Sequence, residues 1–240
     1  MPFQQPSVHV FGIQIDEPVT SLTSLFISGV CLYAFIKLSK IPTQNRTHFF
    51  LRYYFLVMAA ATANGGIIGH AFLFHLSFAW KLIGWILSML SIMLIERASI
   101  EYASKLINKR ISYWLKWINL FELILFVTIT IVTLNFFFVE VHTAYGLLIV
   151  VASLHLYVYW KTRSEGSRLF LIAVSFASVS AIIYMNQLGI SKWFTHSDIS
   201  HILLAIAAYY FYRGASKMTR ENVLIKNQPT DKKLFHMEKI

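Results

Sequence analysis

The sequence predicts an all-α membrane protein, a bundle of seven transmembrane helices with the N-terminus outside and the C-terminus in the cytoplasm. Hydrophobic residues fill 57% of its 240 positions, and the mean hydropathy is +0.59. The chain contains seven apolar stretches, each of about the 20 residues that cross a hydrocarbon core of about 30 Å. Of its 21 Lys and Arg residues, 19 lie on alternate connections between these stretches. The sequence lacks the short alternating strands of a β-barrel.

Each stretch is apolar nearly all round rather than on one face, as expected for a helix that contacts lipid. Backbone groups in lipid must find their hydrogen-bond partners within the segment, so each stretch is predicted to be a helix. In chain order the stretches run Val19–Ser39, Phe49–Phe72, Phe78–Ile95, Tyr113–Phe136, Val141–Trp160, Arg168–Gln187 and Ile199–Gly214.

The basic residues set the predicted orientation, because cytoplasmic connections carry an excess of Lys and Arg. The predicted outer connections hold only Lys81 and Lys192. The other basic residues follow the first, third, fifth and seventh stretches: Lys37, Lys40, Arg46 and Arg52; Arg97, Lys105, Lys109, Arg110 and Lys116; Lys161, Arg163 and Arg168; and Arg213, Lys217, Arg220, Lys226, Lys232, Lys233 and Lys239.

The predicted organisation is one membrane domain, residues 19–218, between an outer N-terminal segment, residues 1–18, and a mobile basic cytoplasmic tail, residues 219–240. No cleavable signal peptide is expected, because no basic region precedes the first apolar stretch. The net charge of +10 is explained by topology and by attraction to anionic lipid, so no nucleic-acid partner is expected. The only cysteine, Cys31, is expected to be a small apolar packing residue. The predicted location is the bacterial cytoplasmic membrane.

Polar side chains gather at the predicted outer ends of the helices. A charge at the centre of a membrane helix costs about 2.5–3.5 kcal/mol, so ionisable groups there need a structural or functional reason. The sequence predicts one polar pocket at the outer face that takes a metal, a lipid head group or a small polar ligand. Deeper in the bundle, Glu122 and His155 are expected to be hydrogen-bonded packing residues. The predicted pocket also includes Ser197 and, about two turns deeper, Asn64. The residues of the predicted outer layer are Glu17, His70, His75, His142, His196, Asp198 and His201.

A zinc site is one interpretation of this layer. Zinc in an enzyme takes about three nitrogen or oxygen ligands and keeps a further position open for water. His70 and His201, with either His196 or Asp198, are the predicted ligands. The bound water would be the nucleophile. Glu17 or Asp198 would orient ligands or move protons.

The start of the last helix has a second interpretation. Thr195 or Ser197 can cap this helix, and Asp198 in its first turn suits the positive end of the helix dipole. His201 lies beyond this cap, on a face that continues with Ala205 and Ala208. Small residues favour close helix packing, so His201 is predicted to point into the bundle.

Two motifs resemble a known superfamily. The segment Gly69-His70-Ala71-Phe72-Leu73-Phe74-His75 resembles the histidine motif of the CREST superfamily, which includes alkaline ceramidases and progestin/adipoQ-type receptors. The segments Ser197-Asp198-Ile199-Ser200-His201 and Ala207-Ala208-Tyr209-Tyr210-Phe211-Tyr212-Arg213-Gly214 resemble its last helix. Glu17-Pro18-Val19-Thr20-Ser21-Leu22-Thr23 is similar to the opening of an uncharacterised family of bacterial membrane proteins. The resemblance implies seven helices and zinc-dependent hydrolysis of lipid amides, with His70 and His201 as ligands.

Three functions remain open from the sequence. The first is a zinc-dependent hydrolase that cleaves a lipid amide or ester at the outer face. The second is a non-catalytic sensor that binds a membrane lipid or a small molecule in the same pocket, with an unidentified protein partner on the cytoplasmic side. The third is a haem protein with His70 and His201 as axial ligands.

Overall fold

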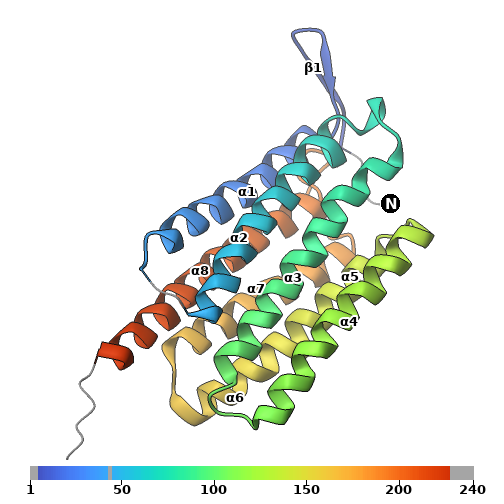
Figure 1. The fold of residues 1–240 in the computed structure, drawn as a ribbon. Coiled ribbons are helices and arrows are strands. Elements are labelled where there is room, and N and C mark those ends of the chain that lie inside the picture. The colour runs from blue at the N-terminus through green and yellow to red at the C-terminus, as the bar shows by residue number, and fades with distance from the viewer. Residues whose placement is uncertain (1–4, 43–44, 228–240) are drawn as a thin grey trace, which may run out of the picture.

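The computed structural model describes residues 5–42 and 45–227, with side chains described as far as residue 219. In this part of the chain seven helical rods pack into one bundle (Figure 1). Two rods include a π-helical turn, Gly65–Ala71 after α2 and Tyr145–Val151 between α5 and α6. The helices are α1 Pro18–Ser39, α2 Arg46–Asn64, α3 Lys81–Ala103, α4 Lys109–Thr133, α5 Phe137–Ala144, α6 Ala152–Thr162, α7 Glu165–Met185 and α8 His196–Asn227, with short 3-10 turns at Leu73–His75 and Phe78–Trp80.

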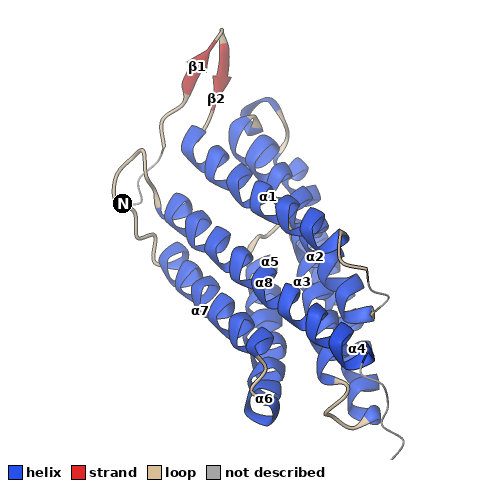
Figure 2. Ribbon diagram, turned by 90° about the vertical axis from the view of Figure 1, so that its left-hand side faces the viewer, coloured by secondary structure: helices blue, strands red, loops and turns tan. Residues whose placement is uncertain are grey.

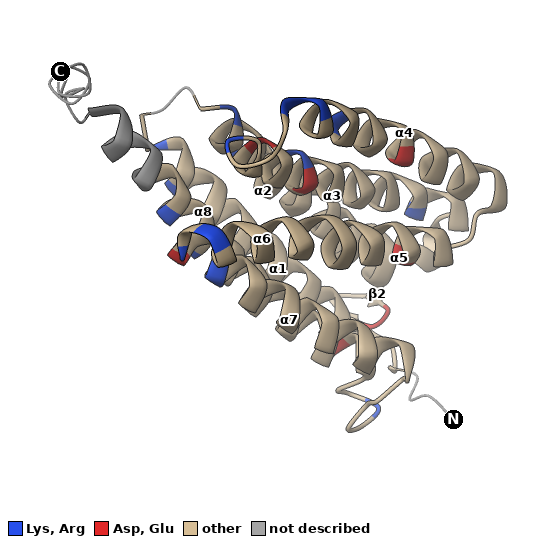
Figure 3. Cartoon of the chain, turned by 90° about the horizontal axis from the view of Figure 1, so that it is seen from below, with Lys and Arg blue, Asp and Glu red and all other residues tan. Residues whose placement is uncertain are grey.

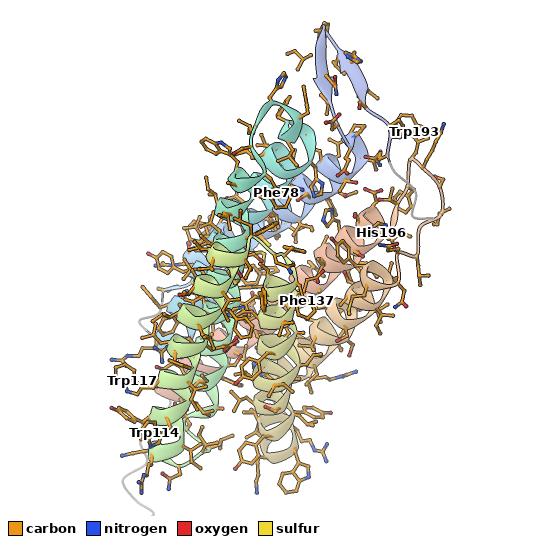
Figure 4. The ribbon with its side chains drawn as sticks, turned by 90° about the vertical axis from the view of Figure 1, so that its right-hand side faces the viewer. Phe78, Trp114, Trp117, Phe137, Trp193 and His196 are labelled. Carbon is orange, nitrogen blue, oxygen red and sulfur yellow. The ribbon has the colours of Figure 1, made fainter. Side chains whose placement is uncertain are left out.

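Five of the rods are long and apolar enough to cross a membrane, so the chain is a helical membrane protein. The other two rods contain α2 and α8, which carry more polar residues. Trp114 and Trp117 project from α4 near one end of the bundle, and Trp193 lies at the opposite end (Figure 4). Tryptophan is enriched where membrane and water meet. The five candidate spans are Pro18–Ser39, Phe78–Ala103, Lys109–Thr133, Phe137–Thr162 and Glu165–Met185.

Basic residues mark one end of the bundle. Figure 3 shows most Lys and Arg where α2 and α4 begin and where α6 meets α7. Lys81 and Lys192 stand apart from this group, as the alternation in the sequence predicts. The fold therefore separates a strongly basic end from an end that carries the N-terminal segment.

Serine hydroxyls hold α1 against α2. Three of them, four or three residues apart on one face of α1, donate to carbonyl oxygens of α2 and its π-helical extension. The bonds are Ser28 Oγ to Ala59 O at 2.8 Å, Ser24 Oγ to Thr62 O at 2.9 Å and Ser21 Oγ to Gly66 O at 2.8 Å. Such bonds join helices where lipid removes the usual hydrophobic driving force.

Small residues let α7 and α8 approach closely. A side chain at Gly214 would meet Phe170 at 2.6 Å and the carbonyl oxygen of Gly166 at 2.9 Å. Farther along the same contact, Ser180 and Ser200 each donate a hydroxyl hydrogen bond to the other's carbonyl, at 2.9 and 3.0 Å. Close backbone approach through glycine and serine is typical of membrane helix pairs. Cys31 is buried and has no disulfide partner, in agreement with a packing role.

The N-terminal segment contains a β-hairpin that the sequence analysis did not predict. Strands β1 (Val8–Val10) and β2 (Ile13–Ile15) pair antiparallel and project beyond the helices (Figure 2). Phe11 and Gly12 make the turn, both with positive φ, of 52° and 79°. Two-residue hairpin turns of this kind suit the twist of the strands. The hairpin leads into α1 through Asp16, whose N–H donates to the carbonyl of Ala71 at 3.0 Å.

Two helices run past the predicted ends of their segments. The third stretch was ended at Ile95, but α3 continues to Ala103, and Glu96, Ser99 and Ile100 are among the residues that it buries there. The helix α8 continues to Asn227, past residue 218, where the membrane domain was predicted to end, and that domain boundary stays a prediction. The predicted mobility of the tail falls partly on residues 228–240, which lie outside the described residues.

Candidate functional site

Glu17 and His70 form the first part of a polar cluster at the N-terminal end of α1. Glu17 precedes α1 and adopts a left-handed backbone conformation, with φ of 42°. Its Oε2 atom accepts from His70 Nδ1 at 2.5 Å, and the two side chains are 44% and 25% exposed. This hydrogen bond lowers the pKa of Glu17 and outweighs the opposing effect of burial, with a smaller contribution from the charge of Lys81. Glu17 is therefore an ionised acceptor within reach of water.

His201 of α8 completes the cluster. Its ring lies 5.8 Å from the ring of His70, centroid to centroid, at an angle of 74°. His201 Nδ1 lies 3.0 Å from Thr23 Oγ1. The Thr23 hydroxyl also lies 3.1 Å from Thr20 O and 3.5 Å from Asp198 Oδ1, so it can donate to either of them and accept from Nδ1. His70 Nδ1 faces a carboxylate, which can only accept, so this nitrogen carries a proton.

Asp198 belongs to the capping structure of α8. Its fully buried carboxylate accepts from Thr195 N at 2.6 Å and from Thr195 Oγ1 at 2.8 Å. An acidic side chain three positions after the N-cap that bonds back to the N-cap N–H forms one half of a capping box. Gln5 ties this cap to α1: its Nε2 donates to Asp198 at 3.4 Å and its Oε1 accepts from Val19 N at 2.9 Å. The predicted catalytic role of Asp198 remains a prediction.

Four residues of the predicted pocket lie elsewhere. The ring of His196 packs on the ring of Tyr184 of α7, with 5.3 Å between the centroids. It does not reach His201 because it lies five positions earlier, about 140° around the helix. His75 is in a 3-10 turn after the helix has ended, where it is exposed and stacks on Phe74. Asn64 and Ser197 also stand outside the cluster. Asn64 faces Gly84 of α3, and Ser197 is half-buried in the first turn of α8.

The predicted zinc site is therefore incomplete in the described part of the chain. His70 and His201 lie together, but His196 does not join them, and the carboxylate of Asp198 is directed to Thr195. Catalytic zinc sites usually have three protein ligands. Two imidazoles fit a metal only if another molecule supplies the remaining ligands.

His142 lies in a second, buried cluster and not in the predicted outer layer. It is on α5, which packs against α3 and α4, so its ring faces Glu122. His142 Nε2 lies 3.7 Å from Glu122 Oε1, and both side chains are almost completely buried. Glu96 of α3 joins them: one ligand atom from each of the three residues lies within 4.8 Å of the others. Within the described residues this is the group that could hold a metal ion.

Glu96 was missed because the third predicted stretch ended one residue before it. The neighbouring Arg97 suggested an aqueous connection, yet Glu96 is fully buried. Asn119 of α4 donates to Glu96 Oε2 at 3.0 Å. A signal was available in the sequence, since Ile92, Glu96, Ser99 and Ala103 share one face of a helix and all are buried in the structure.

Comparisons with known proteins give a family but no activity. No curated protein and no solved structure matches the chain at a significant level. The resemblance to the CREST superfamily therefore stays a prediction. One family model matches residues 19–220, which cover the whole helical bundle up to the last turns of α8. Because that match extends over most of the sequence, the chain belongs to DUF6962, a family of unknown function.

Proposed function

We propose that the cluster of Glu17, His70 and His201 is a binding site at the outer face of the membrane. Its ligand is a lipid head group or small molecule that donates hydrogen bonds. The protein itself is proposed to be a seven-span integral protein of the bacterial cytoplasmic membrane. The observation that carries the proposal is that Nδ1 of His70 lies on Glu17 and Nδ1 of His201 on Thr23, so the Nε2 side of each ring is turned away from these contacts. The two rings stand beside the carboxylate of Glu17, which is partly exposed.

The chemistry of the cluster selects the ligand. An imidazole Nε2 atom without a proton and the carboxylate of Glu17 both accept hydrogen bonds. A hydroxyl or ammonium group supplies the matching donors, and an ammonium group also matches the negative charge. The incomplete set of zinc ligands favours the sensor hypothesis, binding without catalysis, over the hydrolase hypothesis.

All seven rods are proposed to cross the membrane, with the N-terminal hairpin outside and the end of α8 in the cytoplasm. The support is the excess of Lys and Arg at one end of the bundle. Cysteines introduced one at a time at exposed positions test this orientation. The native Cys31 is buried and should not react with the label. We expect a membrane-impermeant maleimide to label His9→Cys in intact cells and Thr162→Cys only after permeabilisation. Labelling of Thr162→Cys from outside would contradict the orientation.

The binding proposal is tested with purified full-length protein and short-chain phosphatidylethanolamine, with phosphatidylcholine, whose head group has no hydrogen-bond donor, for comparison. We expect the ethanolamine lipid to raise the melting temperature and to bind about tenfold to hundredfold more weakly to Glu17→Gln and His70→Ala. That is the loss expected for a hydrogen bond to a charged group, about 1.5–3 kcal/mol. His75→Ala is the matched control for His70→Ala, because His75 lies five residues after His70 on the same segment but outside the cluster. Equal binding of both lipids by all variants would contradict the proposal.

A zinc-dependent hydrolase is the second candidate. One observation favours it: a histidine that donates Nδ1–H to a carboxylate has the orientation typical of metal ligands, and His70 makes that bond with Glu17. When bound, zinc would supply an activated water. The same lipid incubation with added zinc, followed by mass spectrometry of the products, separates the two functions. Released head group or fatty acid that depends on His70 and His201 would favour the hydrolase.

A further inference from the structure

We propose that Glu96, Glu122 and His142 bind a divalent transition-metal ion that fastens α4 to the rest of the bundle. The three ligands come from three different rods, α3, α4 and α5. This centre is separate from the outer cluster, and its three side chains are almost completely buried. Its role is therefore structural.

Unpaired polar atoms point to a missing partner. Both ring nitrogens of His142 are buried without a hydrogen-bond partner, and the oxygens of Glu122 and Oε1 of Glu96 have none apart from each other. Buried polar groups are almost always paired, and several orphaned groups in one place require an explanation. Here they face one another, with His142 Nε2 3.7 Å from Glu122 Oε1. A cation between them would satisfy all three side chains.

The charges agree with a divalent ion. Two carboxylates and a neutral imidazole carry a charge of −2, and an ion of charge +2 makes the centre neutral. Neutrality matters because uncompensated charge inside a membrane is costly. Carboxylate and imidazole together suit zinc, manganese and iron. The ligand atoms lie within 4.8 Å of one another, whereas atoms bonded to one such ion at about 2.0–2.2 Å are at most about 4 Å apart. Small side-chain rotations close that difference.

The surroundings hold Glu96 in place. Asn119 Nδ2 donates to Glu96 Oε2 at 3.0 Å and to the carbonyl of Met93 at 3.3 Å, which leaves Oε1 free to face the centre. Such supporting hydrogen bonds orient metal ligands. Glu96, Asn119, Glu122 and Tyr145 also line a small cavity in the structure.

The burial pattern of α4 explains why a metal is needed. Its buried residues are Ser112, Asn119, Glu122 and Thr130, and none of them is apolar. Much of its apolar surface faces outward, including Trp114 and Phe121. Membrane helices associate through packing and polar contacts rather than through the hydrophobic effect. With so little apolar packing, α4 depends on the contacts of Glu122 and Asn119.

The test uses full-length protein in detergent, stripped with chelator and reloaded with Zn²⁺ or Mn²⁺ alone. We expect the wild type to take up metal, to melt at a higher temperature with it, and to exchange the backbone amides of α4 more slowly. Glu122→Gln keeps the shape of the side chain but removes its charge, and should lose this metal and both effects. His142→Gln is the second variant, in case one of them fails to fold.

Two controls separate this centre from the outer cluster. His70→Ala should keep the metal-dependent protection of α4, because His70 is not in the buried centre, and so should His75→Ala. If the reloaded wild type holds no metal, or if Glu122→Gln binds it and protects α4 as the wild type does, the inference is wrong. Neither result bears on lipid binding by Glu17 and His70, so this inference and the proposed function can fail independently.

Discussion

Replacing Gly146 by alanine is expected to push Glu96 out of the buried centre and to lower the stability of the bundle. Gly146 is the second residue of the π-helical stretch Tyr145–Val151, and a side chain there would overlap Glu96 Oε1 and lie 2.5 Å from Ile92 Cγ2. Overpacking of this kind costs about 1–3 kcal/mol. The displaced carboxylate would also lose its place beside Glu122 and His142, so metal uptake should fall with stability.

The measurement is the melting temperature of the purified variant with and without zinc. Gly69→Ala is the matched control, because Gly69 lies in the other π-helical turn and a side chain there would have nothing within 4 Å. It should melt at the wild-type temperature or above, since alanine favours a helix over glycine. A Gly146→Ala protein with wild-type stability and zinc response would show that Glu96 is not confined by this contact.

The helical bundle was predictable because its signal is long and repeated. A stretch of about 20 apolar residues has few alternatives to a membrane helix, and the alternation of basic residues separates the two ends. The hairpin was missed because the search was directed at long stretches. Its signal was nevertheless present: Val8–Val10 and Ile13–Ile15 flank a two-residue turn that contains Gly12.

The candidate site was predictable only in part, because hydropathy gives the depth of a residue but not the direction in which it faces. His70, Glu17 and His201 were placed in one layer, and the structure also brings their side chains together. His142 was given a place in that layer, but it faces α4 instead. Rotation of a helix about its axis is set by packing with its neighbours. Apolar residues all round a helix leave that rotation open.

Glu96 shows a different limit. Beside Arg97, a carboxylate at the end of an apolar stretch normally marks the membrane boundary. Here the two neighbours face different ways: Glu96 is fully buried, whereas Arg97 donates to the carbonyl of Lys116 at 3.0 Å. Adjacent residues on a helix point about 100° apart, so one can face the bundle while the next faces its edge. The packing of α3 against α4 and α5 decides which of the two residues is buried.

Replacing Asp198 by alanine is expected to destabilise the protein by about 2–4 kcal/mol, the sum of a lost N-cap interaction and of buried donors left unpaired. The carboxylate accepts from the N–H and the hydroxyl of Thr195, and Gln5 lies within reach at 3.4 Å. Its loss would free the start of α8 and loosen the N-terminal segment. Asp198→Asn should lose less, because the amide retains one oxygen acceptor.

Two measurements separate this structural role from a catalytic one. The melting temperature should fall in Asp198→Ala without any ligand, and protease should cut the N-terminal segment near Ser7 faster than in the wild type. Gln5→Ala should share the second effect, because Gln5 Oε1 also accepts from the N–H groups of Val19 and Thr20. If Asp198→Ala melts and resists protease as the wild type does while lipid turnover is lost, Asp198 is catalytic after all, and the capping box contributes little to the fold.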